Sequence, residues 1–351
     1  MTGGVGAILE SAQERRVFSA AAWSYGTAER TLDSGTIGTL SWGGQAADAD
    51  TLWDLASVTK PIVGLAVMSL VESGQLLLDD TIGQHLPAFA ASDKANLTVR
   101  QLLTHTSGIP GQIPLYRWCA TPAQMLDAIR DVPVAFPAGT NVTYSSQGFI
   151  LLGRIAEAVS GLPLDQVVAQ RVTGPVGMSR TRFVLPPDAQ HRAAATEECP
   201  WRGRVVQGTV HDENAEVLGG VAGHAGLFAP LADLEALGQV LCRGGSGAHG
   251  RLLSPAGLAR MTEPATDHLP LRRGLAWQGR DREDSPAGDL LGPRAYGHTG
   301  FTGTSLWVDP DFGIYIVLLT NRVHPSRAGE EFARVRRLVH NEAARDATVN
   351  A

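Results

Sequence analysis

The chain has 351 residues and a formal net charge of −6, with 44% hydrophobic and 18% charged residues. This composition is typical of a globular protein with a large buried core. The acidic balance and the lack of a Lys/Arg run argue against a nucleic-acid partner. No window approaches 18 consecutive apolar residues, so we expect no membrane span.

Three widely spaced cysteines, Cys119, Cys199 and Cys242, form no C-x-x-C motif. Their pattern indicates reduced thiols rather than a zinc or redox centre. The first residues, "MTGGVGAILESAQERR", show no basic segment followed by an apolar one, so no signal peptide is expected. We therefore expect a cytoplasmic protein without metal or cofactor.

The first third of the chain mixes helical and strand patterns. An amphipathic helix is predicted over residues 5–16, followed by β-like runs at 16–26 and 36–44 that end in glycine. Residues 61–73 are apolar nearly all round, which is typical of a buried helix, and Gly74 ends it. Residue 98, a threonine, is a plausible N-cap for the short helix that follows it.

Helices dominate the middle of the chain, and strands return near its end. Further amphipathic helices are predicted at 148–161 and 230–245. From about residue 270 the period becomes two, and the predicted elements are strands at 271–278, 295–300, 303–310 and 313–321, a hairpin turn at 309–313, a long exposed loop at 279–294 and a last helix at 327–345.

These elements predict an α+β fold. Strands from both ends of the chain would build one antiparallel sheet flanked by helices, with a helical lobe inserted between them. We expect a single unit over residues 1–351. Residues 1–60 and 270–351 would form the sheet-containing lobe and residues 61–269 the mainly helical lobe.

Ser57 and Lys60 stand at the start of the buried helix, and Lys60 is one of only two lysines in the chain. Residues three apart share a helix face, so the hydroxyl and the amine can meet. A serine attacks a carbonyl only when a base takes its proton, and a lysine serves as that base only with a lowered pKa. Burial and the positive end of a helix dipole both lower it.

Two further segments carry polar groups suited to the same chemistry. Tyr144 lies in "TYSSQG", ahead of a helix, where a phenol can relay protons. The strand "YGHTGFTGTSLW", residues 296–307, is rich in small residues, which let its backbone approach a ligand and offer N–H groups to an oxyanion. Each segment alone would equally suit a surface turn or a strand edge.

Taken in order, these motifs resemble the serine β-lactamase and penicillin-binding-protein superfamily, in particular its class C branch with related esterases and D-amino-acid peptidases. The resemblance covers most of the chain, and the stretch "VHDENAEVLGGVAGHAGLF" is similar to a subgroup related to cell-wall carboxypeptidases. The matching stretches are residues 54–87, 97–111, 143–161, 174–178, 219–241 and 296–322.

The resemblance implies a β-lactamase/transpeptidase-like fold and assigns roles to individual residues. Ser57 would be the acyl-accepting nucleophile, Lys60 its base and Tyr144 a second proton carrier. The substrate would bind at Ser146, His298, Thr299, Gly300 and Phe301, with the N–H groups of Ser57 and Phe301 around the oxyanion.

Two positions depart from the family pattern. Ser146 stands where an asparagine is usual, and it lacks the donor and acceptor pair of an amide. His298 stands where a lysine is usual. A histidine is mostly neutral at pH 7 unless a carboxylate raises its pKa, so a permanent cation for a substrate carboxylate is missing.

Other histidines suggest no catalytic role. His211, Asp212 and His224 fit no metal-ligand spacing, and a structural or cavity-lining role is expected for them. His105 is expected to bond to backbone at a helix end.

The sequence therefore predicts a serine hydrolase that cleaves a small ester or amide through an acyl-enzyme at Ser57. A β-lactamase or D-Ala-D-Ala carboxypeptidase built on the same residues is the first alternative. A non-catalytic ligand-binding module is the second. Neither the physiological substrate nor the oligomeric state follows from the sequence.

Overall fold

The computed structural model describes residues 4–350. At its centre is one antiparallel sheet in the order β2-β1-β12-β11-β10-β9. The first strand of the chain, β1, is the neighbour of the last strand, β12, and pairs with it in the register Trp23↔Leu318. The strands are β1 (Ala20–Thr27), β2 (Thr31–Gly38), β9 (Gln278–Gly279), β10 (Tyr296–Thr299), β11 (Ser305–Asp309) and β12 (Ile314–Thr320).

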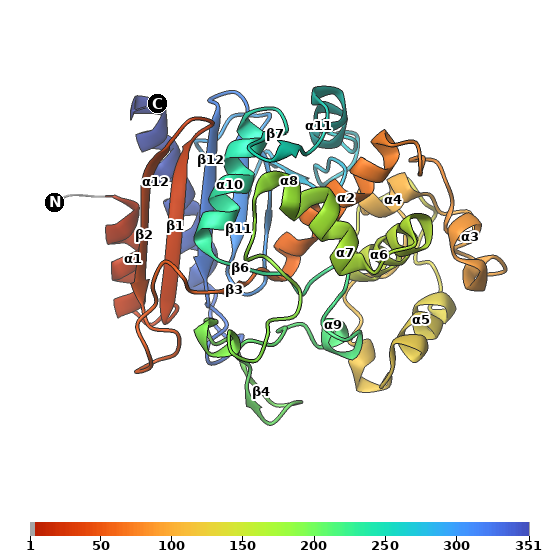
Figure 1. Cartoon of the computed structure of the whole chain (residues 1–351), viewed down its shortest axis with the longest axis horizontal. Helices are drawn as coiled ribbons and strands as arrows, with labels where there is room; N and C mark the ends of the chain where they lie inside the picture. Colours follow the sequence, from red (N-terminus) through yellow and green to blue (C-terminus); the bar gives the residue numbers. More distant parts are fainter. Residues whose placement is uncertain (1–3, 351) are drawn as a thin grey trace.

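Helices cover both faces of this sheet, as Figure 1 shows. Helices α1 (Val5–Glu14) and α12 (Glu331–Asn350) pack on one face, and α10 (Leu231–Cys242) packs on the other. Side chains of β1 alternate accordingly. Ala20 and Ala22 join the core under α10, whereas Ala21 and Trp23 join the core under α1 and α12.

The remaining helices form a second layer beyond α10, on the right in Figure 1. Its centre is α2 (Thr59–Glu72), which is buried over most of its length, and α2 contacts α6 (Ser146–Ser160). The other helices are α3 (Ile82–His85), α4 (Val99–Leu103), α5 (Pro122–Asp131), α7 (Leu164–Val168), α8 (Gly174–Val176), α9 (Glu213–Val217) and α11 (Pro255–Thr262).

Short elements connect the two layers. The two-stranded pairs are β3 (Trp53–Asp54) with β6 (Phe228–Ala229), β4 (Glu198–Cys199) with β5 (Arg204–Val205), and β7 (Ser246–Gly247) with β8 (Gly250–Arg251). Single helical turns are η1 (Ala56–Val58), η2 (Pro87–Phe89), η3 (Leu115–Arg117), η5 (Gln190–Arg192) and the π-helical η4 (Ala169–Thr173).

The α+β prediction is confirmed, with antiparallel strands at both ends of the chain and helices between them. Thr98 caps α4 in a capping box with Gln101, and Gly161 ends α6 in the left-handed conformation. The division at residues 60 and 270 stays a prediction, and α10, from the predicted helical segment, packs on the sheet.

One predicted strand is wrong. Residues 271–278 were expected to form a strand, but β9 begins only at Gln278, and Arg273 contributes a single β-bridge to Gln278. The reason is a tight turn within the segment, where Ala276 has a positive φ of 66°. The last helix begins at Glu331 rather than near residue 327.

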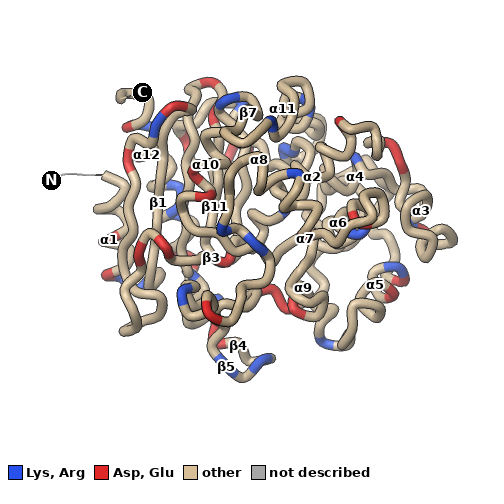
Figure 2. Tube along the Cα trace, viewed as in Figure 1, with Lys and Arg blue, Asp and Glu red and all other residues tan. Residues whose placement is uncertain are grey.

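Surface charges of both signs alternate along the chain, and Figure 2 shows Lys and Arg interspersed with Asp and Glu rather than gathered on one face. Within residues 4–350, no helix has the length and apolar character needed to cross a membrane.

The buried side-chain amide of Asn321, directly after β12, links the last strand to the start of β1. The carboxamide oxygen of Asn321 accepts from the N–H groups of Ser19 (3.2 Å) and Ala20 (3.0 Å). Its nitrogen donates to the Ser19 hydroxyl and to the carbonyl oxygens of Leu40 and Ala195. Substituting Asn321→Ala removes all of these bonds and leaves the N–H groups of Ser19 and Ala20 and the Ala195 carbonyl oxygen without their partner, so we expect a loss of roughly 3 kcal/mol in the free energy of unfolding.

Urea denaturation measures this loss, and Asn350→Ala on the exposed end of α12 is the matched control. A midpoint for Asn321→Ala equal to that of the control would show that the amide does not hold the termini together.

Candidate active site

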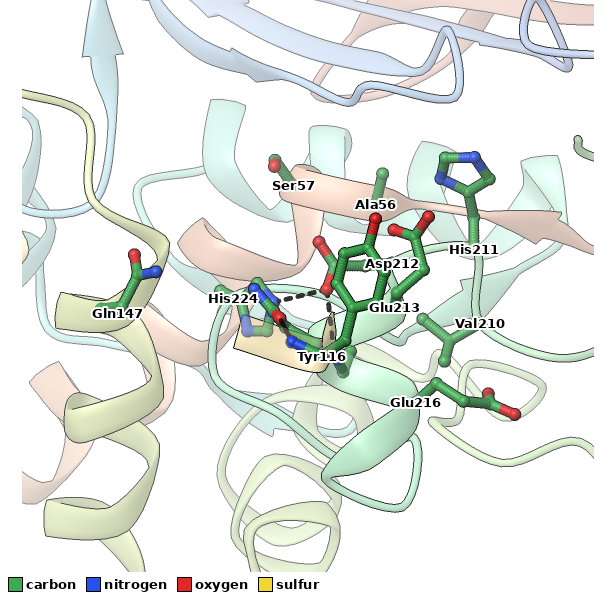
Figure 3. A network of polar contacts seen from close by, with 12 residues as sticks. Ala56, Ser57, Tyr116, Gln147, Val210, His211, Asp212, Glu213, Glu216 and His224 are labelled. Carbon is green, nitrogen blue, oxygen red and sulfur yellow. Dashed lines mark hydrogen bonds and ion pairs between the residues drawn. The ribbon is translucent and has the colours of Figure 1, made fainter. Parts of the chain in front are cut away.

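Ser57 lies in a strained turn between β3 and α2. The residue before it, Ala56, has φ of +46°, a conformation that costs energy for any residue except glycine. The buried Asp54 carboxylate stabilises this turn by accepting from the N–H groups of Ala56 (2.8 Å) and His211 (2.6 Å). Figure 3 shows Ala56 and Ser57 close to Asp212. The fold therefore holds the serine in a fixed position.

Lys60 contacts Ser57 directly, as the spacing predicted. Its Nζ lies 3.1 Å from the Ser57 Oγ and donates to the carbonyl oxygen of His224 at 3.0 Å. The side chain is fully buried. Burial lowers the pKa of Lys60 to about 7, and the Asp212 charge opposes that shift. At neutral pH a large fraction of the amine is therefore unprotonated and able to take the serine proton.

Tyr144 lies over Lys60, whose Nζ is 4.6 Å from the centre of the phenol ring. Its hydroxyl is buried and has no partner of good hydrogen-bond geometry within residues 4–350. The Ser57 hydroxyl favours the phenolate, but burial outweighs it and raises the Tyr144 pKa. The phenol therefore keeps its proton at pH 7, so Lys60 and not Tyr144 is the group available to accept a proton.

The Tyr144 turn is held by its neighbours. The ring of His105 packs against that of Tyr144 at 4.7 Å, and its Nδ1 accepts from the Ser145 N–H at 3.0 Å, so the expected backbone bond of His105 is present. A Cβ on Gly111 would lie 1.7 Å from the Tyr144 carbonyl oxygen, so only glycine fits there. Ser146 follows as the first residue of α6, and its N–H donates to the Gly111 carbonyl oxygen at 3.1 Å.

Strand β10 brings His298, Thr299 and Gly300 against the Ser57 turn. A Cβ on Gly300 would lie 2.5 Å from the Leu55 carbonyl oxygen, so the glycine permits this contact. Burial and the Lys60 charge lower the pKa of His298 to about 3, and its Nδ1 bonds to the Thr299 carbonyl oxygen at 2.8 Å. His298 is thus neutral at pH 7.

Phe301 follows the end of β10, and its N–H donates to no protein acceptor within residues 4–350. The side chain is 47% exposed and stacks on His211, with ring centres 5.8 Å apart. An unpaired N–H beside the Ser57 turn can donate to an oxyanion. Its role as an oxyanion donor stays a prediction, as do the catalytic and binding roles of the other predicted site residues.

The family of this chain follows from comparison with known proteins. Residues 7–341 match the model of the Beta-lactamase family. The chain belongs to the β-lactamase family. It is therefore a serine hydrolase with a β-lactamase/transpeptidase-like fold, which confirms the resemblance inferred from the motifs.

Proteins similar to this β-lactamase-family chain include a putative carboxypeptidase, a hydrolase and a penicillin-binding-protein homologue. A putative D-alanyl-D-alanine carboxypeptidase of Escherichia coli K12 is 33% identical over 309 residues, covering 79% of this chain and 70% of the relative. Among solved structures, the hydrolase EstCE1 has a TM-score of 0.78 at 22% identity and covers 98% of this chain and 97% of its own. A penicillin-binding-protein homologue of Pyrococcus abyssi has a TM-score of 0.76 at 20% identity, and the match covers 95% of this chain and 76% of the homologue.

Arg273 is a site residue that the sequence analysis missed. Burial is the main cause of the lowered pKa values of His105 and His298 and the raised pKa of Tyr144, and the Arg273 charge adds to the first two shifts and opposes the third, which indicates that it lies in the same region. The side chain is only 9% exposed. It donates to the Arg272 carbonyl oxygen at 2.9 Å and forms no ion pair within residues 4–350. The segment had been assigned to a strand, and no sequence signal distinguishes this arginine from the others.

His211, Asp212 and His224 do not form a metal site. The His211 ring bonds to Glu197 at 2.8 Å, whereas the His224 ring bonds to Asp212 at 3.0 Å (Figure 3). Residues 4–350 contain no group of three or more His, Cys, Asp or Glu side chains placed to hold a metal ion. The expected non-ligand roles of these residues are consistent with this arrangement.

Burial of the Lys60 amine should lower the free energy of unfolding at pH 7. Between pH 7 and 10.5 the folded amine is neutral while the unfolded amine is protonated, so the unfolded state binds more protons and stability rises with pH. We expect Lys60→Met to raise the free energy of unfolding at pH 7 by roughly 3 kcal/mol and to flatten its pH dependence over this window. Denaturant titrations from pH 7 to 10.5 measure both effects.

Lys94 is the matched control, because it is the other lysine and is equally buried. Its Nζ donates to Asp93 (2.6 Å) and to the carbonyl oxygens of Arg130 (2.9 Å) and Val132 (2.6 Å). Lys94→Met removes these bonds and should destabilise the fold. Equal destabilisation by both substitutions would show that Lys60 is not a buried neutral amine.

Proposed function

We propose that the protein hydrolyses a small ester or amide through an acyl-enzyme on Ser57. The observation that carries this proposal is the 3.1 Å contact between Ser57 Oγ and a fully buried Lys60 amine whose pKa is about 7. A hydroxyl beside a neutral amine is an activated nucleophile. Membership of the β-lactamase family and the likeness in fold to EstCE1, described as a hydrolase, support the same chemistry.

In the acylation step, Ser57 Oγ attacks the substrate carbonyl carbon while its proton passes to Lys60 Nζ. The carbonyl oxygen becomes an oxyanion, and the N–H groups of Ser57 and Phe301 donate to it. Collapse of this intermediate breaks the bond to the leaving group. Tyr144 donates its phenol proton to the departing oxygen or nitrogen and takes the proton held by Lys60.

In the deacylation step, water attacks the acyl-enzyme from the same side. Lys60, neutral again, accepts a proton from that water, and the new oxyanion lies at the same N–H groups. Collapse releases the acid and returns the proton to Ser57. These two reaction steps need no metal or cofactor, since Lys60 and Tyr144 carry every proton.

Ser57→Ala tests the proposal. We expect hydrolysis of p-nitrophenyl acetate and butyrate to fall by at least about a thousandfold, because the attacking oxygen is gone while the rest of the site stays intact. Steady-state kinetics measures the loss, and mass spectrometry of the wild-type protein with a fluorophosphonate should locate one adduct on Ser57. A wild-type rate in Ser57→Ala would remove this residue from the mechanism.

The same experiments address the alternatives. A chromogenic cephalosporin assayed in parallel detects a β-lactamase. A wild-type protein that a fluorophosphonate and penicillin both fail to label would instead be a non-catalytic binding module. Ser73→Ala, at the exposed far end of α2, is the control for a general effect of replacing a serine.

A second candidate is a D-Ala-D-Ala carboxypeptidase, and Arg273 is the observation that favours it. His298 is neutral, but Arg273 places an unpaired and almost buried cation near Tyr144 and His298. A guanidinium binds a carboxylate strongly, and Arg273 forms no direct ion pair among the described residues, although the Asp281 charge opposes the lowering of its pKa by burial, so a substrate carboxylate could offset the remaining cost of burial. The relative from Escherichia coli named a putative D-alanyl-D-alanine carboxypeptidase points the same way.

Arg273→Gln tests this candidate. With a diacetyl-Lys-D-Ala-D-Ala peptide, we expect kcat/KM to fall roughly tenfold or more, because the substrate carboxylate loses its cation. The rate with p-nitrophenyl acetate, which carries no carboxylate, should change much less. The ratio of the two kcat/KM values is the measured quantity.

Arg272→Gln is the control, since Arg272 is the preceding residue and pairs with Asp267 at 2.9 Å. A wild-type protein that hydrolyses only esters, or an Arg273→Gln variant that loses both activities equally, would contradict carboxylate recognition by Arg273.

A further inference from the structure

The Asp212 carboxylate is linked to Ser57 by three consecutive hydrogen bonds. The His224 ring bonds to Asp212 Oδ1 through Nε2 at 3.0 Å. The His224 carbonyl oxygen accepts from Lys60 Nζ at 3.0 Å, and Lys60 Nζ lies 3.1 Å from Ser57 Oγ. The mechanism described above uses Lys60 and Ser57 but gives no role to Asp212 or His224.

The carbonyl oxygen of His224 determines how the Lys60 amine is oriented. A carbonyl oxygen only accepts hydrogen bonds, so Lys60 must direct an N–H at it. A neutral amine has a single lone pair, and with an N–H held by His224 the lone pair is free to face the Ser57 hydroxyl. The position of this carbonyl therefore restricts the orientations of the amine and keeps one in which its lone pair faces Ser57.

The segment around His224 is fixed on both sides. The Leu227 N–H donates to the Thr59 hydroxyl at 3.2 Å, next to Lys60, and the Leu55 N–H donates to the Leu227 carbonyl oxygen at 2.9 Å. A Cβ on Gly223 would lie 1.9 Å from the Phe149 carbonyl oxygen, so α6 holds the segment from the other side. The Asp212 bond to the buried His224 ring adds the side-chain restraint.

Asp212 is itself held in place at the start of α9, where its side chain accepts from the Ala215 N–H at 2.8 Å. A carboxylate accepts hydrogen bonds, so His224 Nε2 carries the proton. Although burial opposes ionisation, His224, the Ala215 N–H and Lys60 together keep the pKa of Asp212 well below its usual range. The group is therefore an anion at every pH at which Lys60 titrates.

We propose that the Asp212–His224 pair positions Lys60 for catalysis: the carboxylate fixes the His224 ring, and the His224 carbonyl oxygen orients the amine beside Ser57. This inference rests on the proposed acyl-enzyme function. Asp212 is a positioning residue that acts through Lys60.

The other ionisable groups around Lys60 leave Asp212 as the charge that controls it. His105 and His298 have lowered pKa values and Tyr144 has a raised one, chiefly because all three are buried, so each is neutral at pH 7. Arg273 is the cation felt by those three groups. Asp212 opposes the lowering of the Lys60 pKa by burial, so its removal should lower that pKa further.

Asp212→Asn separates the charge from the hydrogen bonds, because asparagine can accept from His224 and caps a helix as well as aspartate does. The rate of fluorophosphonate labelling at Ser57, followed by intact mass from pH 5 to 9, reports the neutral amine without requiring the natural substrate. For the wild type we expect the labelling rate to fall below about pH 7 (the acid limb) and to be constant above it (the plateau). In Asp212→Asn the acid limb should shift downward by about one pH unit. The plateau rate should also be lower, because Lys60 is then a weaker base.

Asp212→Ala and Asp127→Asn complete the set. Asp212→Ala removes the bonds as well as the charge, so the same downward shift should come with a plateau below that of Asp212→Asn. Asp127→Asn, on exposed α5, changes net charge equally and should leave the limb in place. Thermal melts verify that the variants are folded.

Two results would be unfavourable, and they can be distinguished. Labelling of Ser57 with an unshifted acid limb and an unchanged plateau in both Asp212 variants would overturn the positioning role while leaving the proposed function intact. A wild-type protein that is never labelled at Ser57 would overturn the proposed function, and the positioning role with it.

Discussion

The site depends on one costly arrangement, a lysine amine buried without a carboxylate partner. Lys60 and Lys94 are the only lysines, and both are fully buried. Lys94 is paired with Asp93 and two carbonyl oxygens, so its charge is compensated. Lys60 has one carbonyl and one hydroxyl, and its pKa falls to about 7. Lys94 therefore has a structural role, whereas Lys60 can act as a proton acceptor, because the acceptors that surround the two amines differ.

The rest of the fold excludes solvent from the Lys60 amine and holds it beside Ser57. Helix α2 is buried in the helical layer, and the β6 segment, the Tyr144 turn and strand β10 enclose its first turn. Glycines at positions 111, 223 and 300 let backbone segments approach where a Cβ would clash. The polar groups of the site are thus fixed by main chain from four separate regions, which is the preorganisation that acyl transfer requires.

Electrostatic balance at the site is also a property of the assembly. Asp212 and Arg273 place one anion and one cation near a set of neutral groups, namely His105, Tyr144 and His298. The anion favours protonation of Lys60, and the cation is the group proposed above to bind a substrate carboxylate. Neither residue is close in sequence to Ser57, so their effect on it depends on how the sheet and the helices pack.

Local chemistry made much of the protein predictable. The period-two strands, the capped helices and the Ser57–Lys60 contact follow from side-chain periodicity and from helix geometry over three residues. Other features did not follow. The turn at residue 276 broke a predicted strand, because its positive φ leaves no trace in an apolar pattern.

The sequence by itself predicted the α+β fold class and the contact between Ser57 and Lys60, because side-chain periodicity and the geometry of one helical turn are local properties of the chain. Only the tertiary structure decided that Arg273 and Asp212 reach the site and that His298 is neutral. Burial and Coulomb interactions depend on distances through space, and residues 212, 273 and 298 are far from Ser57 and Lys60 along the chain.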